Sequence, residues 1–283
     1  MQEKVHIAQT LLEALPYIKK FHNDIVVVKY GGSAQSSDTL KASFAQDIVM
    51  LHAVGIKPVV VHGGGKNITG LLGDLGIKSH FVDGQRVTTK EAMRIVEMVL
   101  SGEINQEIVA LLNSQGARAV GLSGKDANFL EAVAKDAGAF GYTGVIEHVN
   151  PEVIRGVLDH GFVPVIAPIA SGGTLGHPGY NINADLAASQ IAVALGARKV
   201  VFLTDTPGVL DQTGALMSNL SIAQTEAHKE NGTIHGGMVP KVDACIEALR
   251  GSVKKAHIVD GRVEHALLLE ILTNSGIGTC IEL

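Results

Sequence analysis

Short apolar runs alternate with longer stretches of helical spacing along most of the chain. The runs predict strands over residues 25–30, 57–62, 117–121, 162–167, 198–204 and 255–259. The intervening stretches predict helices over 38–54, 66–75, 89–115, 151–160, 184–195, 239–250 and 263–272. Runs that are apolar throughout are typical of strands buried on both faces of a parallel sheet. The pattern therefore predicts an α/β fold, a three-layer αβα sandwich around a central, mostly parallel open sheet.

Other segments depart from this alternation. Residues 1–22 precede the first strand and carry apolar residues at helical spacing, which predicts an added N-terminal helix. The segments 127–135 and 142–149 predict a surface β-hairpin, and 206–217 predicts a second one. A soft boundary between two lobes is expected within 190–197.

Composition narrows the class of protein. The chain has 283 residues, 33 glycines and a formal net charge of −5, without a long basic run, so nucleic acid is not an expected partner. The start "MQEKVHIAQ" lacks an apolar signal core, and no run of about 18 apolar residues occurs. We therefore expect a cytoplasmic protein that does not enter a membrane. Cys245 and Cys280 are expected to be small buried apolar residues.

Two strands run directly into glycines, in "VVVKYGGSA" (26–34) and "VVVHGGGKN" (59–67). Neither junction matches the Walker A pattern GxxxxGK[ST] or the dinucleotide pattern GxGxxG. Glycines at the carboxyl end of a strand still let backbone N–H groups approach an anion. A helix that begins at Lys66 would add positive potential. A tight turn without a ligand is the alternative for either junction alone.

Two lysines and a carboxylate stand in unusual places. Lys29 lies within an apolar strand, and Lys241 falls in the first turn of a helix that begins near Pro240, where a cation opposes the helix dipole. An anionic ligand would offset both costs, although solvated lysines are the simpler explanation for each alone. Asn183 can cap a helix that has Asp185 in its first turn, and this carboxylate could hold the two lysines.

Two further polar residues are candidates for ligand binding. Arg86 is expected in a short loop before a helix capped by Thr88 or Thr89, where its guanidinium fork would match a carboxylate. Asn181 follows the glycine-rich approach "SGGTLGHPGY" and has no role in capping. A surface position is the plain alternative for Arg86.

These motifs together resemble the acetylglutamate kinase branch of the amino-acid kinase family. The similarity rests on "VVKYGGSA", "VVVHGGGKNI", "DGQRVT", "AVGLSGKD", "YNINADLAA", "LTDTPGVLD" and "GGMVPKVDACIEALRGSVKKAHIVDG", in this order over essentially the whole chain. The resemblance implies the amino-acid kinase fold and transfer of a phosphoryl group from ATP to the side-chain carboxylate of N-acetyl-L-glutamate, in arginine biosynthesis. Such a nucleophile is ionised at neutral pH, so catalysis needs positioning and positive charge rather than a base.

The resemblance also implies roles for individual residues. Lys29 and Lys241 would stabilise the transferring phosphoryl group, and Asp185 would orient both lysines. Gly32 and Gly65 would donate backbone N–H groups to the phosphoryl oxygens. The acetylglutamate would lie against Gly64, Gly65, Arg86 and Asn181. The nucleotide would lie against Lys29, Gly31, Thr204, Asp205, Val209 and Lys241.

The division into lobes and the metal follow from the same resemblance. Residues 23–193 would form an acetylglutamate-binding N-lobe, and residues 194–283 a nucleotide-binding C-lobe. Magnesium would be carried on the ATP phosphates, because no dense carboxylate cluster provides a cage. His62 is expected to be a packed, hydrogen-bonded histidine.

The two ends of the chain resemble those of the arginine-inhibited members. There, N-terminal helices interlace dimers into a ring-shaped homohexamer, a trimer of dimers. By that resemblance L-arginine would be an inhibitor, bordered by Tyr17, Lys199, His257, Glu270 and Gly276. A simple docking helix and an ordinary closing strand are the alternative. A regulatory signalling-protein partner is not identified by the sequence.

Two other functions stay open at this point. A sister kinase would act on a carrier-linked aminoadipate or glutamate and should differ in charge near Arg86 and Asn181. A non-catalytic amino-acid sensor could use the same fold, although the presence of Lys29, Asp185 and Lys241 together argues against it.

Overall fold

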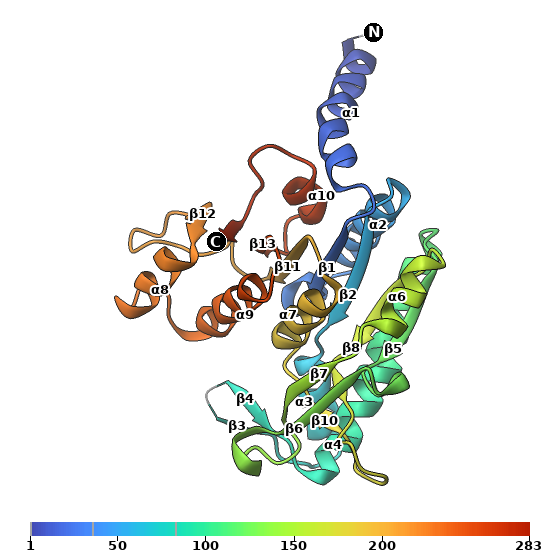
Figure 1. The fold of residues 1–283 in the computed structure, drawn as a ribbon, viewed down its shortest axis with the longest axis vertical. Helices are drawn as coiled ribbons and strands as arrows, with labels where there is room; N and C mark the ends of the chain where they lie inside the picture. The colour runs from blue at the N-terminus through green and yellow to red at the C-terminus, as the bar shows by residue number, and fades with distance from the viewer. Residues whose placement is uncertain (1, 36, 83) are drawn as a thin grey trace.

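One eight-stranded sheet runs through the whole molecule (Figure 1). The computed structural model describes residues 2–35, 37–82 and 84–283. Across the sheet the strands are β12 (Asn219–Ser221), β14 (Thr279–Glu282), β13 (Lys255–Asp260), β11 (Lys199–Thr204), β1 (Ile25–Tyr30), β2 (Lys57–His62), β8 (Val163–Ala167) and β5 (Ala119–Ser123). The pair β13–β14 is antiparallel, and the other neighbours are parallel. The predicted mostly parallel sheet is confirmed.

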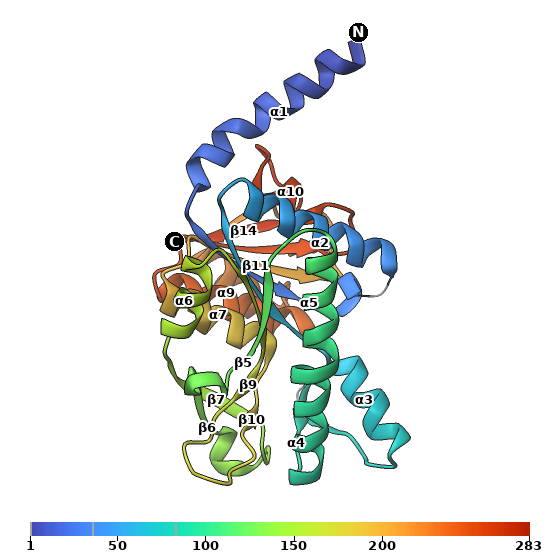
Figure 2. The same ribbon diagram turned by 90° about the vertical axis from the view of Figure 1, so that its right-hand side faces the viewer.

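Helices cover both faces of this sheet (Figure 2). Alternate residues of β1 show why, since Val26 and Val28 are buried on one face and Val27 on the other. The first face packs against α2 (Asp38–Ala53), α5 (Asn105–Ser114) and α10 (Ala266–Ile271). The second packs against α6 (Glu152–Asp159), α7 (Ala184–Leu195) and α9 (Val239–Arg250). The predicted three-layer αβα sandwich is confirmed.

The long helix predicted over 89–115 forms, but it is not α-helical throughout. It consists of α4 (Lys90–Glu97), a π-helical turn over Met98–Ile104 and α5. The extra residue of a π-turn rotates the residues that follow it relative to a regular helix, and such turns are frequent at functional sites. Asn105, the first residue of α5, follows this turn directly and is buried.

Small elements lie outside the main layers. The hairpin of β6 (Leu130–Ala134) and β7 (Gly144–Val149) is confirmed, with a bulge at Glu131–Ala132. The second predicted hairpin, over 206–217, is present only in reduced form: a single antiparallel bridge joins Leu210 and Leu216, and the rest of the segment is loop. Asp211 Oδ1 accepts hydrogen bonds from the N–H groups of Thr213 and Ala215. These bonds from a side chain stabilise the turn in place of hydrogen bonds between two strands.

Other elements were not predicted from the apolar pattern because they are short or polar. They are the hairpin of β3 (His80–Val82) and β4 (Gln85–Val87), the antiparallel pair of β9 (Ile169–Ala170) and β10 (Tyr180–Asn181), and the helix α8 (Ile222–Glu230). The expected helix at 66–75 is α3 (Gly65–Asp74), and the one at 263–272 begins only at Ala266. The expected lobe boundary at 193–194 falls inside α7, and the sheet continues across it; the division into lobes stays a prediction.

The first helix, α1 (Gln2–Phe21), projects away from the rest of the molecule (Figure 1). Its Leu11 and Leu12 side chains are 61% and 65% exposed. Exposed apolar side chains on a projecting helix are typical of a surface that binds another protein chain. Over the residues that the structure describes, no helix combines the length and apolar character needed to cross a membrane.

Candidate active site

The two glycine junctions lie side by side at the carboxyl edge of the sheet. Strands β1 and β2 are paired in parallel, with Tyr30 opposite His62, so both strands end at the same level. The Gly63 N–H donates to the Tyr30 carbonyl over 2.8 Å. A Cβ placed on Gly31 would lie 3.4 Å from both Gly63 N and Lys29 Nζ. Glycine at position 31 therefore allows the close approach of the two junctions.

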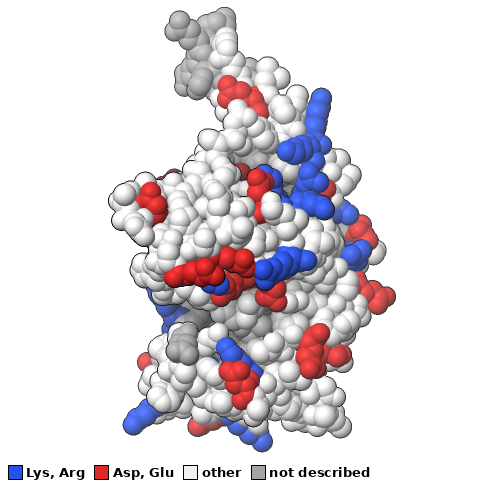
Figure 3. All heavy atoms as spheres, turned by 60° about the vertical axis from the view of Figure 1, so that its left-hand side comes forward, with Lys and Arg blue, Asp and Glu red and all other residues white. Residues whose placement is uncertain are grey.

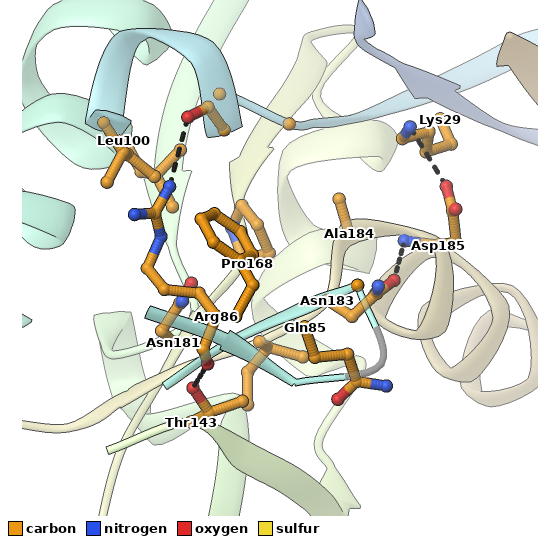
Figure 4. A pocket seen from close by; sticks show the side chains of 17 residues that line it. Lys29, Gln85, Arg86, Leu100, Thr143, Pro168, Asn181, Asn183, Ala184 and Asp185 are labelled. Carbon is orange, nitrogen blue, oxygen red and sulfur yellow. Dashed lines mark hydrogen bonds and ion pairs between the residues drawn. The ribbon is translucent and has the colours of Figure 1, made fainter. Parts of the chain in front are cut away.

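A cavity of about 230 Å³ opens beyond these junctions (Figure 4). Gly63, Gly64 and Gly65 line it. Lys29 and Asp185 lie at one end of it and Arg86 at the other. Ligands of open α/β sheets bind beyond the carboxyl ends of strands, near the point where the chain reverses its direction across the sheet. The cavity lies at such a point, because β1 has β2 on one side and β11 on the other.

Asp185 joins the two lysines that the sequence singled out. Its Oδ1 lies 3.0 Å from Lys29 Nζ, and its Oδ2 accepts a hydrogen bond from Lys241 Nζ, also over 3.0 Å. Burial alone would raise the pKa of Asp185, but the two ammonium groups outweigh it and hold that pKa below its ordinary value. The carboxylate is thus ionised and positions two cations side by side.

Local sequence explains where Asp185 lies. Asn183 caps α7, and its Oδ1 accepts from the N–H groups of Asp185 over 2.8 Å and Leu186 over 3.2 Å. Helix α9 begins beside α7, with Pro240 and Lys241 in its first turn as predicted. The Ser189 hydroxyl donates to the Ala244 carbonyl over 2.6 Å and ties these two helices together. The lysine of α9 is thereby brought to the carboxylate of α7.

The middle glycine of the second junction has no room for a side chain. A Cβ on Gly64 would lie 2.3 Å from Ile104 Cδ1 and 2.7 Å from Leu100 Cδ2, and both side chains are buried. Helix α3 begins at the next residue, Gly65, which lines the cavity. The backbone N–H groups of the first turn of α3 therefore lie at the end of the helix that borders the cavity. These N–H groups and the helix dipole supply positive potential.

We expect Gly64→Ala to destabilise the protein through this contact. Overpacking of a core costs about 1–3 kcal/mol, and the strain should also displace the junction. The additional change Ile104→Val removes the Cδ1 atom that the new methyl group would meet, so it should recover much of the lost stability. Thermal unfolding of the single and double variants measures this. Gly65→Ala is the matched control, because nothing lies within 4 Å of a Cβ at that position; equal destabilisation by both alanines would contradict the packing explanation.

Arg86 is a buried strand residue, which corrects the expectation of a loop position. It lies in β4, and Nη2 donates to Thr69 Oγ1 over 2.8 Å and to the Gly65 carbonyl over 3.2 Å. Its guanidinium carbon lies 4.7 Å from the centre of the Phe81 ring. Of the two possible caps for the following helix, Thr89 is the one used. Arg86 therefore presents a fixed positive charge to the far end of the cavity.

Asn181 lines the same cavity and is connected to Arg86 through two hydroxyl groups. Its Nδ2 donates to Thr88 Oγ1 over 3.2 Å, and Thr88 Oγ1 and Thr143 Oγ1 are 2.8 Å apart. The Thr143 hydroxyl in turn donates to the Arg86 carbonyl. Thr88, Thr143 and Phe81 were not identified as residues of the site from the sequence, because isolated residues of these types carry no spacing signal.

A second cavity, of about 630 Å³, lies on the β11 side. Thr204, Asp205 and Val209 line it, as does Lys241. These four residues are among those that the resemblance assigns to the nucleotide. Since Lys241 and Lys29 both pair with Asp185, this carboxylate stands where the second cavity meets the first. Gly32, with φ +66°, lies in the turn after β1, and glycine suits that left-handed backbone.

A third cavity, of about 200 Å³, lies where α1 meets the sheet. All five residues expected to contact arginine line it: Tyr17, Lys199, His257, Glu270 and Gly276. Lysine and arginine side chains gather on the surface at this end of α1 (Figure 3). The cavity therefore combines a buried carboxylate with surrounding cations.

The Glu270 carboxylate is held firmly in this third cavity. It accepts from His257 Nδ1 over 2.6 Å, and its Oε2 accepts from the N–H groups of Ile277 over 2.7 Å and Gly278 over 3.0 Å. Burial would raise the pKa of Glu270, but these hydrogen bonds lower it below the usual value. Burial lowers the pKa of Lys199 to about 8. His257 Nε2 is buried without a hydrogen-bond partner among the described residues.

No group of three or more His, Cys, Asp or Glu side chains in the described part of the chain is arranged to hold a metal ion. Cys245 and Cys280 are both free and buried, as predicted.

Comparison with known proteins identifies the family. The family model described as the amino acid kinase family matches residues 24–260. The chain is 69% identical over 283 residues to the acetylglutamate kinase of Sulfurovum sp. strain NBC37-1, and each chain is covered completely. It is 54% identical over 269 residues to the acetylglutamate kinase of Helicobacter hepaticus, covering 95% of this chain and 96% of that one.

Solved structures show the same fold. The N-acetylglutamate synthase of Neisseria gonorrhoeae with coenzyme A and N-acetyl-glutamate gives a TM-score of 0.87 at 27% identity, covering 98% of this chain but only 63% of that one. A complex of that synthase with coenzyme A and L-arginine gives a TM-score of 0.81 at 26% identity, covering 97% of this chain and 65% of that one. The matches over the full length of the kinases, together with the family model, show that this chain belongs to the acetylglutamate kinase branch of the amino-acid kinase family.

Proposed function

We propose that the protein phosphorylates the side-chain carboxylate of N-acetyl-L-glutamate with ATP, giving N-acetyl-L-glutamyl 5-phosphate and ADP, as a step of L-arginine biosynthesis. The observation that carries this is the pair of ammonium groups held by Asp185 where the two cavities meet. An attacking carboxylate and a triphosphate repel each other, and two fixed cations at their meeting point offset that repulsion.

The first cavity suits an acylated amino dicarboxylate. Arg86 would bind the carboxylate that does not react, and Asn181 would contact the amide-bearing end of the substrate. The carboxylate to be phosphorylated would then lie near Gly64 and Gly65, close to Lys29. Positioning of this kind replaces a catalytic base, because the nucleophile is already ionised at neutral pH.

ATP would occupy the second cavity, with its phosphates directed toward Lys29 and Lys241. Lys241, which lines that cavity, would lie on the side of the leaving ADP. Gly31, Gly32 and the free N–H groups at the start of α3 would approach the phosphates through their backbone. Magnesium would arrive on the nucleotide and neutralise phosphate charge there, since the described residues offer no metal cage of their own.

A hydroxamate assay tests the reaction directly, because hydroxylamine traps the acyl phosphate. Several carboxylates should be compared at equal concentration with ATP: N-acetylglutamate, glutamate, aminoadipate and their carrier-linked forms. N-Acetylglutamate should give the highest kcat/KM. A preference for a carrier-linked substrate would instead assign the protein to a sister kinase, and no product with any of them would favour a sensor.

We further propose that L-arginine inhibits the enzyme from the third cavity. Glu270 would pair with the guanidinium group, and Lys199 would attract the α-carboxylate. Support comes from the five lining residues, from the place of this cavity at the foot of α1, and from the arginine complex of the related synthase. Arginine would act by shifting an equilibrium between wider and tighter rings of a homohexamer.

Deletion of residues 1–20 should therefore give an arginine-insensitive dimer. The deletion removes the exposed apolar face of α1, which would interlace the dimers, and also Tyr17 from the third cavity. Light scattering measures the mass, and the hydroxamate assay with and without arginine measures inhibition. A truncated protein that stays hexameric would rule out the interlacing role of α1.

A further inference from the structure

A buried polar pair lies directly behind the second glycine junction. His62 at the end of β2 and Asn105 at the start of α5 are 0% and 2% exposed. Asn105 Nδ2 lies 3.1 Å from His62 Nε2, and His62 Nδ1 lies 3.1 Å from the Gly63 carbonyl oxygen. Neither side chain lines the cavity, so their polar groups act inside the protein.

The hydrogen bonds fix the protons of this pair. Asn105 Nδ2 also donates to the Val165 carbonyl over 2.9 Å, which establishes that the amide nitrogen, rather than its oxygen, faces His62. His62 Nε2 must then accept, so the proton of the neutral ring is on Nδ1, where it donates to the Gly63 carbonyl. Burial lowers the pKa of His62 to about 4, which keeps the ring neutral at physiological pH.

This proton placement determines the direction of one peptide unit. His62 lies on the α5 face of the sheet, whereas Lys29 lies on the opposite face, where it pairs with Asp185 of α7. The C=O and N–H of a trans peptide point in opposite directions. With its carbonyl drawn toward His62, the Gly63–Gly64 unit turns the Gly64 N–H toward the face of Lys29.

The neighbouring N–H group is already engaged, since that of Gly63 donates to Tyr30. Among the described residues, the Gly64 N–H has no protein acceptor. We propose that His62 and Asn105 are positioning residues for phosphoryl transfer, which hold the Gly64 N–H toward the transferring phosphoryl group. This inference rests on the proposed kinase function and adds a pair of residues that contact neither substrate.

The surrounding structure supports a dedicated placement of Asn105. A Cβ on Gly121 would lie only 2.0 Å from Asn105 Oδ1, so the amide fills the space that glycine leaves in β5. The π-helical turn over Met98–Ile104 ends immediately before Asn105, and such turns are frequent at functional sites. A histidine that only filled space would need neither feature.

Two substitutions of His62 separate its two nitrogens. His62→Asn places an amide nitrogen where Nδ1 was, so the donor to Gly63 is retained. His62→Gln places its amide near the position of Nε2 and leaves the Gly63 carbonyl without that donor. In the full-length enzyme we expect kcat for acyl phosphate formation to fall about 10- to 100-fold in His62→Gln, with KM for N-acetylglutamate changed much less. His62→Asn should recover most of kcat.

Thermal unfolding of both variants controls for general damage. Equal kcat in the two variants, whether both high or both low at a native-like Tm, would overturn the role of the Nδ1 donor. An inactive wild-type enzyme would instead reject the proposed function. If His62→Gln does not fold, NMR of wild-type protein labelled with ¹⁵N-histidine shows which ring nitrogen of His62 carries the proton. We expect the proton on Nδ1 above pH 5. A proton on Nε2 would overturn the proposal.

Discussion

Lys241→Ala should lower kcat for acyl phosphate formation by about two to three orders of magnitude, the usual effect of removing one group that stabilises developing charge. The ammonium group lies 3.0 Å from Asp185 and lines the cavity proposed for ATP, so it would stabilise the charge that accumulates on the leaving phosphate. KM for N-acetylglutamate should change little, because the first cavity keeps Arg86, Asn181 and Lys29. Steady-state kinetics with the hydroxamate assay separates the two parameters.

The matched control lies at the other end of the same helix. Arg250 is in the last turn of α9 and pairs with Glu226 at the surface, so Arg250→Ala removes a cation from α9 without touching either cavity. Its kcat should equal that of the wild type. If Lys241→Ala turned over at the wild-type rate, Lys241 would have no part in phosphoryl transfer.

Asp185→Asn should impair both activity and stability. The change leaves two neighbouring ammonium groups without their shared carboxylate, and removing one partner of a buried ion pair costs about 3–5 kcal/mol. The two lysines should then repel each other and leave their positions, so kcat should fall at least as far as in Lys241→Ala. Chemical denaturation and kinetics of one preparation measure both effects.

The effect of Asp185→Asn on stability should depend on pH in a defined direction. The pKa of the Asp185 carboxyl is lower in the folded protein than in the unfolded chain, so its contribution to stability is complete above the unfolded pKa. That contribution is lost as the pH falls through the folded pKa. The difference in unfolding free energy between wild type and variant should therefore be largest near neutral pH and shrink in acid. Asp243→Asn, which breaks a surface pair with Lys229, should cost no more than about 1 kcal/mol; a comparable loss there would contradict the special role of Asp185.

The layers of the fold and the centre of the site follow from local patterns. The runs at 25–30 and 57–62 are strands with those bounds, because each contains three or four consecutive β-branched residues and a glycine follows its last residue. Asn183 and Asp185 lie where a cap and a first-turn carboxylate belong. These signals extend over only a few neighbouring residues, which is why they are readable from one sequence.

Contacts between distant segments were beyond such patterns. The strand β4 that holds Arg86 has only three residues, and its partner β3 is exposed, so no apolar period marks the hairpin. The position of Asn105 depends on a π-turn and on the missing side chain of Gly121, which lies in a different strand. That one carboxylate could hold Lys29 and Lys241 was only a possibility until the resemblance supported it, since no local rule pairs residues so far apart.

The central place of β1 has a consequence for synthesis on the ribosome. Strand β2 follows β1 soon in the chain, but β11, its neighbour on the other side, begins only at Lys199. At about 5–20 residues per second, one edge of β1 stays unpaired for roughly ten to thirty seconds after it has been made. An apolar edge strand invites pairing with another nascent chain, and lysines commonly oppose this. Lys29 is the charged residue within Ile25–Tyr30, and in the nascent chain it interrupts a segment that would otherwise favour aggregation.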